Sequence, residues 1–486
     1  MKINRQAILL LTALLVVVII AAGAFYIVRS RATNTGQSQT SKSTVVVPTA
    51  LPASTPTPVF TTPQASQPGK PVLQTLEQVT NQAFSDEEQY VPNSWGVQKN
   101  RFIRTSTGDL FTVYNTQGAD SSNRMWHLLH KAPGGSWQDI KSGNAGTEPI
   151  NILRGANDEI HLFAWPGTEG KLQHFVSTDL GQTFKSEILS GGWNTDHEQG
   201  YSGSGTNANG AIVFFQTGAD KPGVFNWIYY NPETHKWAFH KNTIDYRYTY
   251  AFFTPGPQND LNIVAMRDVK RQELGYQQAS KTDFDYVFDE VKYFHISDAT
   301  QADPSLSQTL VKQVTPQNRD DYDLTYLTDS YLDTSGRTHI LYNNQYDGPH
   351  HAIVENGKVV KDVKISNISN AAGQKMRITQ DSLGHFYILT IDDDGSLIVD
   401  TANADDTDGT HMGTITKLKV GNNTGCNGND DFCHSPTFTV PRDGSRLTDV
   451  IDGVYGNRNK EFYFRINLRS NGGGGESALL PARPNA

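Results

Sequence analysis

Several short polar segments carry the side chains that could do chemistry. An arginine guanidinium binds a carboxylate through two parallel hydrogen bonds, and carboxylates, tyrosines and histidines can transfer protons. Such side chains occur at Arg101, in residues 196–198 (DHE), 245–248 (DYRY), 319–323 (RDDYD) and 347–351 (DGPHH), and at Arg377. These segments are far apart in the sequence, so they can form one site only if the fold brings them together.

A repeated turn and strand indicates which fold could do so. A Gly or Asp turn followed by an alternating strand recurs at steps of 50, 52, 50, 76, 48 and 60 residues. The copies are at Gly108, Asp158, Gly210, Asp260, Gly336 and Gly384, with a weaker seventh at Gly444. One such unit cannot bury its own faces, so this period predicts radial sheets that cover one another. We therefore expect an all-β propeller of about seven four-stranded blades, or six blades with extra edge strands.

A second motif runs in phase with the first. Residues 177–184 read STDLGQTF, in which Ser177 and Asp179 can bind turn amides. Gly181 tolerates a positive φ, and Phe184 can anchor the outgoing strand in the core. Degenerate copies end at Trp137, Trp237 and Phe284. We expect these segments to be tight turns between antiparallel strands.

The octapeptide resembles the Asp-box, or BNR repeat, of sialidase-like propellers. The resemblance covers roughly residues 85–469, and in that family the boxes are structural turns on the blade rim. One box is intact here, and the segment NRFIRTSTGD at residues 100–109 lacks the Arg-Ile-Pro motif of sialidases. The resemblance therefore implies a fold, and it leaves the reaction open.

The resemblance also implies where an active site would lie. The two kinds of turn share one end of the disk, and the family's active site lies at the other end, among the second-to-third-strand loops and the links between blades. A sialidase-like reaction needs arginines around a carboxylate, a tyrosine nucleophile activated by a glutamate, and an aspartate as acid and base. By position and residue type, the substrate-binding candidates are Arg101, Arg247, Arg319, Arg377, His197 and His350, and the catalytic candidates are Tyr322 or Tyr246, Glu198, and Asp320 or Asp321. The alternative for each arginine is an inter-blade bridge to one of the abundant aspartates.

The 76-residue step holds about 25 extra residues, which we place at residues 287–319. An insertion that enters the functional end of a propeller would act as a lid or specificity loop.

The N-terminal part predicts export. Residues 7–28 are uncharged and apolar, long enough for a membrane-spanning helix, although a cleavable signal peptide is the alternative. We divide the chain into a membrane anchor or signal (1–29), a Ser/Thr/Pro-rich linker (30–84), the propeller (85–469) and a Gly-rich tail (470–486). Residues 73–88 could form one short helix or continue the linker. The propeller is expected outside the membrane, or secreted if the signal is cleaved.

Two further features bear on ligands. Cys426 and Cys433 are expected to form a disulfide outside the membrane. The acidic segments 392–395 and 404–409 offer oxygen ligands that calcium would accept, but neither has the spacing of a known calcium loop, and no other cofactor is expected. The net charge of −9 and the absence of a basic run argue against nucleic acid, and we expect a monomer.

Three functions remain open at this point. The first is a tethered sialidase-like propeller that binds and hydrolyses extracellular glycans, and the second is a non-catalytic scaffold that recognises a protein or polysaccharide. The third is a polysaccharide lyase, in which His197, Tyr246 and His350 would be the groups of interest. Arginines that converge beside a Tyr–Glu pair would favour the hydrolase, and arginines paired off in bridges would favour the scaffold.

Overall fold

The computed structural model describes most of the chain from residue 68 onward. The described ranges are residues 68–83, 98–116, 125–145, 149–165, 171–193, 202–218, 222–280, 285–420, 426, 433–457 and 460–470. The apolar segment 7–28, the linker up to residue 67 and the tail from residue 471 lie outside them. Within the described part, we find no helix long and apolar enough to cross a membrane.

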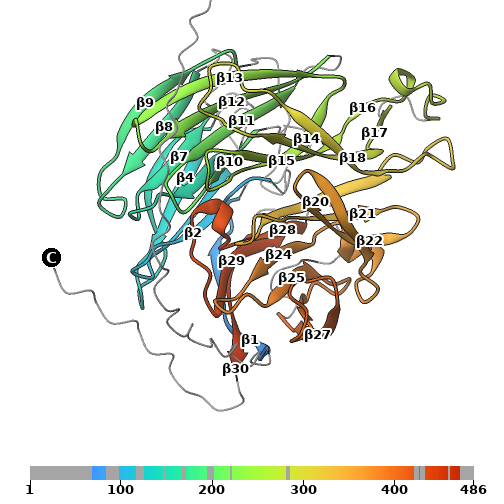
Figure 1. Ribbon diagram of the computed structural model, residues 1–486. Coiled ribbons are helices and arrows are strands. Elements are labelled where there is room, and N and C mark those ends of the chain that lie inside the picture. The colour runs from blue at the N-terminus through green and yellow to red at the C-terminus, as the bar shows by residue number, and fades with distance from the viewer. Residues whose placement is uncertain are drawn as a thin grey trace, which may run out of the picture. The chain divides into compact units, whose positions relative to one another are not determined.

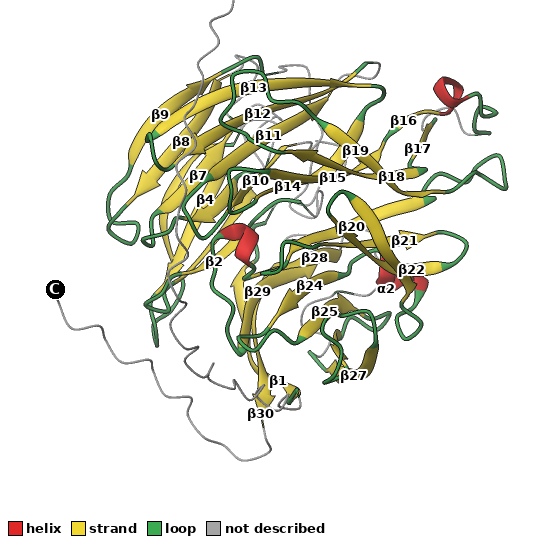
Figure 2. Ribbon diagram, viewed as in Figure 1, coloured by secondary structure: helices red, strands yellow, loops and turns green. Residues whose placement is uncertain are grey.

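Seven four-stranded antiparallel sheets form the blades of a β-propeller (Figures 1 and 2). Blades 1 to 3 are β2(Phe102–Arg104)–β3(Leu110–Thr116)–β4(Met125–Lys131)–β5(Gln138–Asn144), β6(Asn151–Arg154)–β7(Ile160–Ala164)–β8(Lys171–Ser177)–β9(Lys185–Ser190), and β10(Ser202–Thr206)–β11(Ile212–Gly218)–β12(Gly223–Asn231)–β13(Lys236–Ile244). Blades 4 to 6 are β14(Tyr248–Pro255)–β15(Leu261–Arg267)–β18(Glu290–Ile296)–β19(Ser307–Gln313), β20(Thr325–Leu332)–β21(Thr338–Asn344)–β22(Gly348–Glu355)–β23(Lys358–Lys364), and β24(Arg377–Gln380)–β25(Phe386–Ile391)–β26(Leu397–Ala402)–β27(Met412–Leu418). Blade 7 is β28(Cys433–Phe438)–β29(Val450–Asn457)–β30(Lys460–Ser470)–β1(Lys70–Thr80). The predicted seven-bladed propeller is confirmed, and the six-bladed alternative is wrong.

The outermost strand of blade 7 comes from the other end of the chain. β1 pairs antiparallel with β30, with Leu73 opposite Ile466 and Leu76 opposite Phe464. In Figure 1 the blue β1 accordingly lies beside the red β30. The sequence had suggested a linker or a short helix for residues 70–80, and both expectations are wrong. The segment is a strand, and the propeller begins at Lys70 rather than at residue 85. Pairing with β30 makes this segment a strand, because the stability of a strand depends on its neighbours more than on its own residues.

The first turn of every blade explains the repeated Gly or Asp. All seven repeated residues fall between the first and second strands of a blade. Positive φ angles occur at Gly108, Asp158, Gly210, Asn259, Gly336, Gly384 and Gly444, so blade 4 uses the residue before Asp260. Gly444 also has no room for a side chain, because a Cβ there would lie 1.8 Å from the Arg154 carbonyl oxygen. The period thus reflects a backbone conformation that most L-residues avoid.

The octapeptide turn joins β8 to β9 at the same end of blade 2. The Asp179 carboxylate accepts hydrogen bonds from the Thr183 amide at 2.9 Å and from the Ser177 hydroxyl at 2.7 Å. The Gly181 amide donates to Ser177 Oγ at 2.8 Å, with φ of 82° at Gly181. Phe184 packs against the core between blades 1 and 2. The turn is held by its own side chains, and it supplies no free group for a reaction.

The insertion lies earlier than the sequence indicated. Residues 268–289 leave blade 4 between its second and third strands and contain β16 (Val269–Lys270), the 3-10 helix η3 (Arg271–Leu274) and β17 (Tyr286–Val287). The predicted range 287–319 instead holds β18 and β19. The degenerate copy at residues 278–284 consequently belongs to the insertion and is not an outer turn; its last four residues, which include Phe284, lie outside the described residues. The insertion does enter the end of the propeller that was expected.

We predict that the ring depends on β1. A variant lacking residues 1–67 keeps β1 and should melt like the full chain, whereas one lacking residues 1–83 should melt lower. The second variant loses the half-buried Leu73, Leu76 and Val79 and the ion pair of Glu77 with Lys131 in blade 1. Full burial of one large apolar side chain contributes about 1.5–3 kcal/mol, so a loss of a few kcal/mol is expected. Thermal unfolding of both variants measures it, and equal melting temperatures would show that β1 does not close the ring.

Candidate functional site

Two regions of the described structure bear on the predicted chemistry. One is the end where the inner strands begin, here called the linking end, with the axial centre of the ring behind it. The other is a pocket between blades 2 and 3 at the opposite end, here called the turn end, where the first-to-second and third-to-fourth turns of each blade lie.

Two of the predicted arginines do meet near the axis. Arg101 is 4% exposed and donates to Glu461 at 3.2 Å, and Arg377 is 1% exposed with Asp329 at 3.4 Å. Arg442, which the sequence analysis missed, binds the same Asp329 at 3.0 Å from the 3-10 helix η5 (Pro441–Asp443). Burial lowers the pKa of Arg377 to about 10, despite the opposing effect of Asp329. These guanidinium groups lie buried against carboxylates.

The other two arginines lie in the links on either side of blade 4, Arg247 before β14 and Arg319 between β19 and β20. Arg247 donates to the carbonyl oxygen of Asp268 at 2.8 Å and to its carboxylate at 2.9 Å, and stacks over Tyr286. Arg319 donates to the carbonyl oxygens of Gln278 and Ala279 at 2.6 and 3.3 Å. Both arginines thus tie the insertion to the propeller, away from the axial pair.

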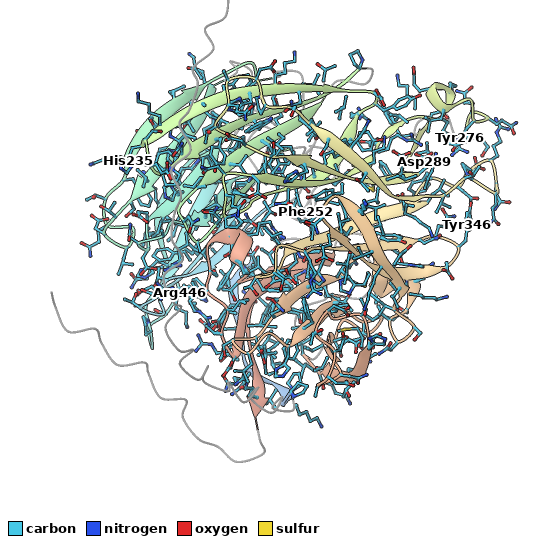
Figure 3. The ribbon with its side chains drawn as sticks, viewed as in Figure 1. His235, Phe252, Tyr276, Asp289, Tyr346 and Arg446 are labelled. Carbon is cyan, nitrogen blue, oxygen red and sulfur yellow. The ribbon has the colours of Figure 1, made fainter. Side chains whose placement is uncertain are left out.

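The segment that follows Arg319 has the same role. Asp320 accepts from the amide of Ser280 at 2.7 Å, and hydrogen bonds from Ser280 lower the pKa of this carboxyl. Asp321 accepts from the Tyr346 hydroxyl and from Gln345 at 3.0 Å. Tyr322 is 46% exposed. Figure 3 labels Tyr346 from this region on the same side of the molecule as Tyr276 of the insertion.

A Tyr–Glu pair exists nearby, but its residues are not the predicted ones. The Tyr248 hydroxyl donates to Glu290, which also pairs with Arg267 at 3.1 Å. Arg267 binds Asp289 through two contacts of 2.7 Å and lies over the ring of the predicted Tyr246. Burial and then the Glu290 charge raise the pKa of Tyr248. A tyrosine that is 1% exposed and harder to ionise cannot reach a substrate as a nucleophile.

His350 completes the predicted set within the described residues. It is 6% exposed, bound to Asp347 at 2.9 Å and to Asp362 at 3.0 Å, and stacked on Tyr342. His197 and Glu198 lie outside the described residues. Among the residues that the structure describes, each of the four predicted arginines is held by contacts with other groups of the protein.

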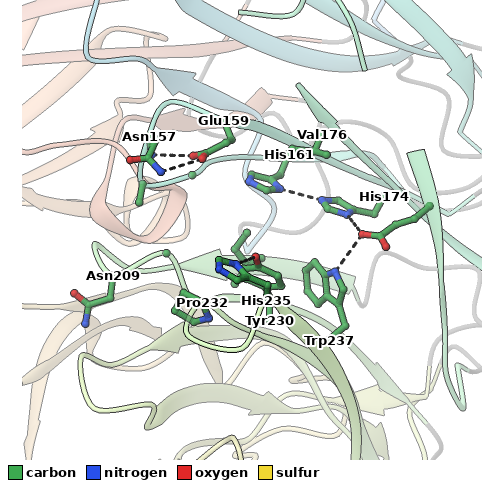
Figure 4. Close-up of a pocket in the computed structure, with 15 residues that line it drawn as sticks. Asn157, Glu159, His161, His174, Val176, Asn209, Tyr230, Pro232, His235 and Trp237 are labelled. Atoms are coloured by element: carbon green, nitrogen blue, oxygen red, sulfur yellow. Dashed lines mark hydrogen bonds and ion pairs between the residues drawn. The ribbon is translucent and has the colours of Figure 1, made fainter. Parts of the chain in front are cut away.

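The pocket between blades 2 and 3 is of a different kind. It has a volume of about 490 Å³ and is lined by residues of β7, β8, β9, β11, β12 and β13 and of the turns at their ends (Figure 4). Its walls include the aromatic rings of Trp237 and Tyr230, with His235 on the rim donating to or accepting from Tyr230 at 3.0 Å. A cavity of this size, with polar side chains set between aromatic walls, fits a small organic ligand.

A chain of hydrogen bonds runs along one wall of this pocket. Glu187 accepts from Trp237 Nε1 at 3.2 Å and bonds His174 Nδ1 at 2.9 Å, and His174 Nε2 bonds His161 Nδ1 at 2.9 Å. The dashed lines in Figure 4 follow this chain. Because a carboxylate only accepts, His174 carries its proton on Nδ1 and accepts on Nε2, so His161 carries its proton on Nδ1. The chain therefore assigns an unprotonated Nε2 to His161.

Burial keeps both imidazoles neutral. It lowers the pKa of His161 to about 3, with the neighbouring His174 acting in the same direction. It also lowers the pKa of His174, against the opposing effect of Glu187. A Cβ built on Gly155 would lie 2.5 Å from Glu159 Oε2 and 2.9 Å from His161 Nε2. Two hydrogen-bond acceptors of the pocket lining thus lie close together, in the position that a side chain at residue 155 would occupy.

The same histidine pair occurs in blade 5, and a register comparison could have found it. His339, like His161, lies three residues after the turn residue of its blade. His351, like His174, pairs with the residue two positions further along that strand, and His339 and His351 are joined at 2.9 Å. There the pair is 0% exposed, and His351 Nδ1 donates to the Gly409 carbonyl oxygen at 2.8 Å. The pair in blade 5 is therefore structural, and only the pair in blade 2 faces a cavity.

Other predicted ligand groups have structural surroundings. Asp406, Asp408 and His411 bring ligand-type atoms within 4.8 Å of one another, but Lys361 already pairs with Asp408. Asp392 and Asp394 flank a hairpin turn and pair with Lys417. Cys426 is disulfide-bonded, and the only other cysteine in the sequence is Cys433.

The fold and the pocket thus define a seven-bladed propeller with a polar inter-blade cavity. No family model matches the sequence, and no curated protein matches it. Solved structures with a similar fold include polysaccharide lyase Uly1 (12% identity, 82% of this chain and 100% of that chain, TM-score 0.49) and the BP39L lectin from Burkholderia pseudomallei (11%, 77% and 97%, 0.48). Virginiamycin B lyase from Staphylococcus aureus is also similar in fold, with 10% identity over 81% of this chain and 99% of that chain and a TM-score of 0.43. With TM-scores below 0.5, these similarities carry no argument about function.

We predict that Arg101 is structural. Arg101→Ala leaves Glu461 buried without its partner, which should lower the free energy of unfolding by about 3–5 kcal/mol. The double variant Arg101→Met with Glu461→Gln removes both charges and should regain most of that loss. Arg446→Ala, at an exposed arginine on the turn end, is the control. Denaturant unfolding measures all three, and an Arg101→Ala protein of unchanged stability would contradict the structural role.

Proposed function

We propose that this protein is a carbohydrate-binding propeller and that the pocket between blades 2 and 3 is its binding site. The observation that carries the proposal is the hydrogen-bond chain from Glu187 through His174 to His161, in a cavity beside Trp237 and Tyr230. This chain assigns an unprotonated Nε2 to His161.

The chemistry of the wall suits a saccharide. A sugar hydroxyl is a donor that a neutral imidazole nitrogen can accept, and a sugar ring presents an apolar C–H face that packs on aromatic rings. Asn157 and Asn209 add amide groups at the pocket. The wall is also pre-formed: His174 stacks on Phe163 with ring centroids 4.8 Å apart, and Trp237 meets His174 edge to face at 5.3 Å. Rigid groups lose little entropy when a ligand binds.

Binding without hydrolysis is the function that we favour. The arginines expected around a substrate carboxylate are engaged in buried ion pairs or hold the insertion, and the described Tyr–Glu pair is buried. A lyase at the pocket would need a base strong enough to remove a carbon-bound proton, and an imidazole with a pKa of about 3 is a weak base. The scaffold alternative of the sequence analysis is therefore adopted, with a saccharide as partner.

We also propose that the propeller works outside the membrane. The support is the apolar segment 7–28 with the Ser/Thr/Pro-rich linker behind it, which would tether the blades at a distance from the bilayer. Protease treatment of intact cells tests this: cleavage of the propeller before lysis is expected, and protection until lysis would contradict it.

A glycan array tests the binding proposal. The full-length chain should bind one or more saccharides, and His161→Phe should weaken binding at least tenfold, because it keeps a ring against His174 and removes the acceptor nitrogen. His411→Ala, at an exposed histidine of blade 6, should bind like the unchanged protein. Absence of binding to any saccharide would sink the proposal, as would equal binding by His161→Phe.

The pH dependence gives a second test. Because the pKa of His161 is lowered to about 3, its Nε2 keeps accepting as the pH falls from 8 to 5. Affinity for a neutral saccharide should change less than threefold over that range. An unperturbed histidine would protonate near pH 6.5, and affinity would then fall by about tenfold or more below it. Calorimetric titration at several pH values separates the two outcomes, and a midpoint near 6.5 would show that the imidazole chain is not as described.

A further inference from the structure

We infer that the pocket between blades 2 and 3 selects saccharides that carry a free primary ammonium group, in preference to neutral or acidic sugars. The inference rests on the proposed carbohydrate binding and adds the class of ligand.

The charge of the pocket lining is the first observation. Its charged side chains are Glu159 and Glu187, and no lysine or arginine is among the described residues that line it. The described hydrogen-bond donors to these carboxylates are neutral groups: Glu159 accepts from the Asn157 amide at 2.8 Å and from its side chain at 3.1 Å, and Glu187 from Trp237 and neutral His174. Two negative charges with no cationic partner among the described residues would repel a uronic or sialic acid and attract a cation.

Both charges act across the same space. Tyr230, on the opposite wall from His161, has its pKa raised by burial first and then by the charges of Glu159 and Glu187. A group placed between these side chains would therefore experience both carboxylates. The rings of Tyr230 and Trp237 present π faces and edges there, and a cation near an aromatic face is attracted by the ring quadrupole.

Two neighbouring hydrogen-bond acceptors favour an ammonium group over a hydroxyl as the ligand group between them. Glu159 and His161 both line the pocket, and Glu159 Oε2 and His161 Nε2 lie 2.5 and 2.9 Å from one point, the position that a Cβ on Gly155 would take. A hydroxyl has one proton and can satisfy one of these acceptors. A primary ammonium has three donors, so it can satisfy both and keep one for a further acceptor.

A metal ion fits this arrangement less well. Structural zinc sites take four ligands, whereas the acceptors that converge at Gly155 are two. The cluster of three ligand-type side chains found among the described residues lies in blade 6, outside this pocket. An amino sugar supplies the cation together with a ring for Trp237 and Tyr230.

Matched saccharides test the inference on the full-length chain. Glucosamine, galactosamine and mannosamine are compared with their parent hexoses, their N-acetyl derivatives and a sialoside, by calorimetry at pH 6 with and without a chelator. At least one amine should bind tenfold or more tightly than its parent hexose and its N-acetyl derivative, unchanged by the chelator. Glu159→Gln should reduce that preference to less than threefold while affinity for the parent hexose stays the same.

Glu233→Gln is the control, because it removes one exposed charge from the neighbouring turn outside the pocket lining. It should leave the preference intact. If hexoses and amines bind equally in a His161-dependent manner, carbohydrate binding stands and the ammonium inference is overturned. If the preference is equal in Glu159→Gln and the unchanged protein, or is lost with the chelator, the inference is also overturned. If no amine, hexose or arrayed saccharide binds, both proposals fail.

Discussion

Every blade of this propeller has two apolar faces, and a four-stranded sheet cannot cover either of them by itself. The faces are covered by neighbouring blades, as where Phe215 of blade 3 stacks on Phe253 of blade 4 with ring centroids 4.1 Å apart. Covering both faces of all blades requires the ring to close. Closure is achieved by pairing β1 with β30, which joins the start of the described chain to its end in one sheet. The positions of all groups on both ends of the ring depend on this contact.

Closure also explains why the axial arginines do not form an open site. The inner strands converge on the axis, so a charged side chain at the start of such a strand is enclosed by its neighbours. Enclosed charges need partners, since removing an ion from water costs several kcal/mol. Arg101 finds Glu461 in blade 7, and Arg377 and Arg442 share Asp329 of blade 5. The predicted position near the axis suggested that these arginines bind a substrate. The same position encloses them, so they form ion pairs with carboxylates of the protein.

The sequence could predict the blades because their period has a local cause. A residue such as Gly108 or Gly384 is needed wherever the inner turn takes a positive φ, and that need is visible without any partner. The strand β1 had no local signal, because its partner lies at the other end of the chain. The insertion was misplaced because β18 resumes the blade where an extra loop was expected. The ion-pair partners and the pocket could not be predicted from the sequence for a related reason. Both depend on which side chains of different blades face each other.

What opens the pocket is the length of one turn on the neighbouring blade. In blade 5, the histidine pair is sealed by the turn of blade 6 between β26 and β27, residues 403–411, whose Gly409 carbonyl oxygen binds His351. The corresponding turn of blade 3, between β12 and β13, is the shorter segment 232–235, and its Pro232 and His235 line the pocket with the pair in blade 2. Glu187 takes the place of the backbone acceptor there, and His161 is left facing the cavity. Blades 2 and 5 thus each contain a hydrogen-bonded histidine pair. In blade 2, where the neighbouring turn is shorter, the pair lines a cavity in which we propose that a ligand binds.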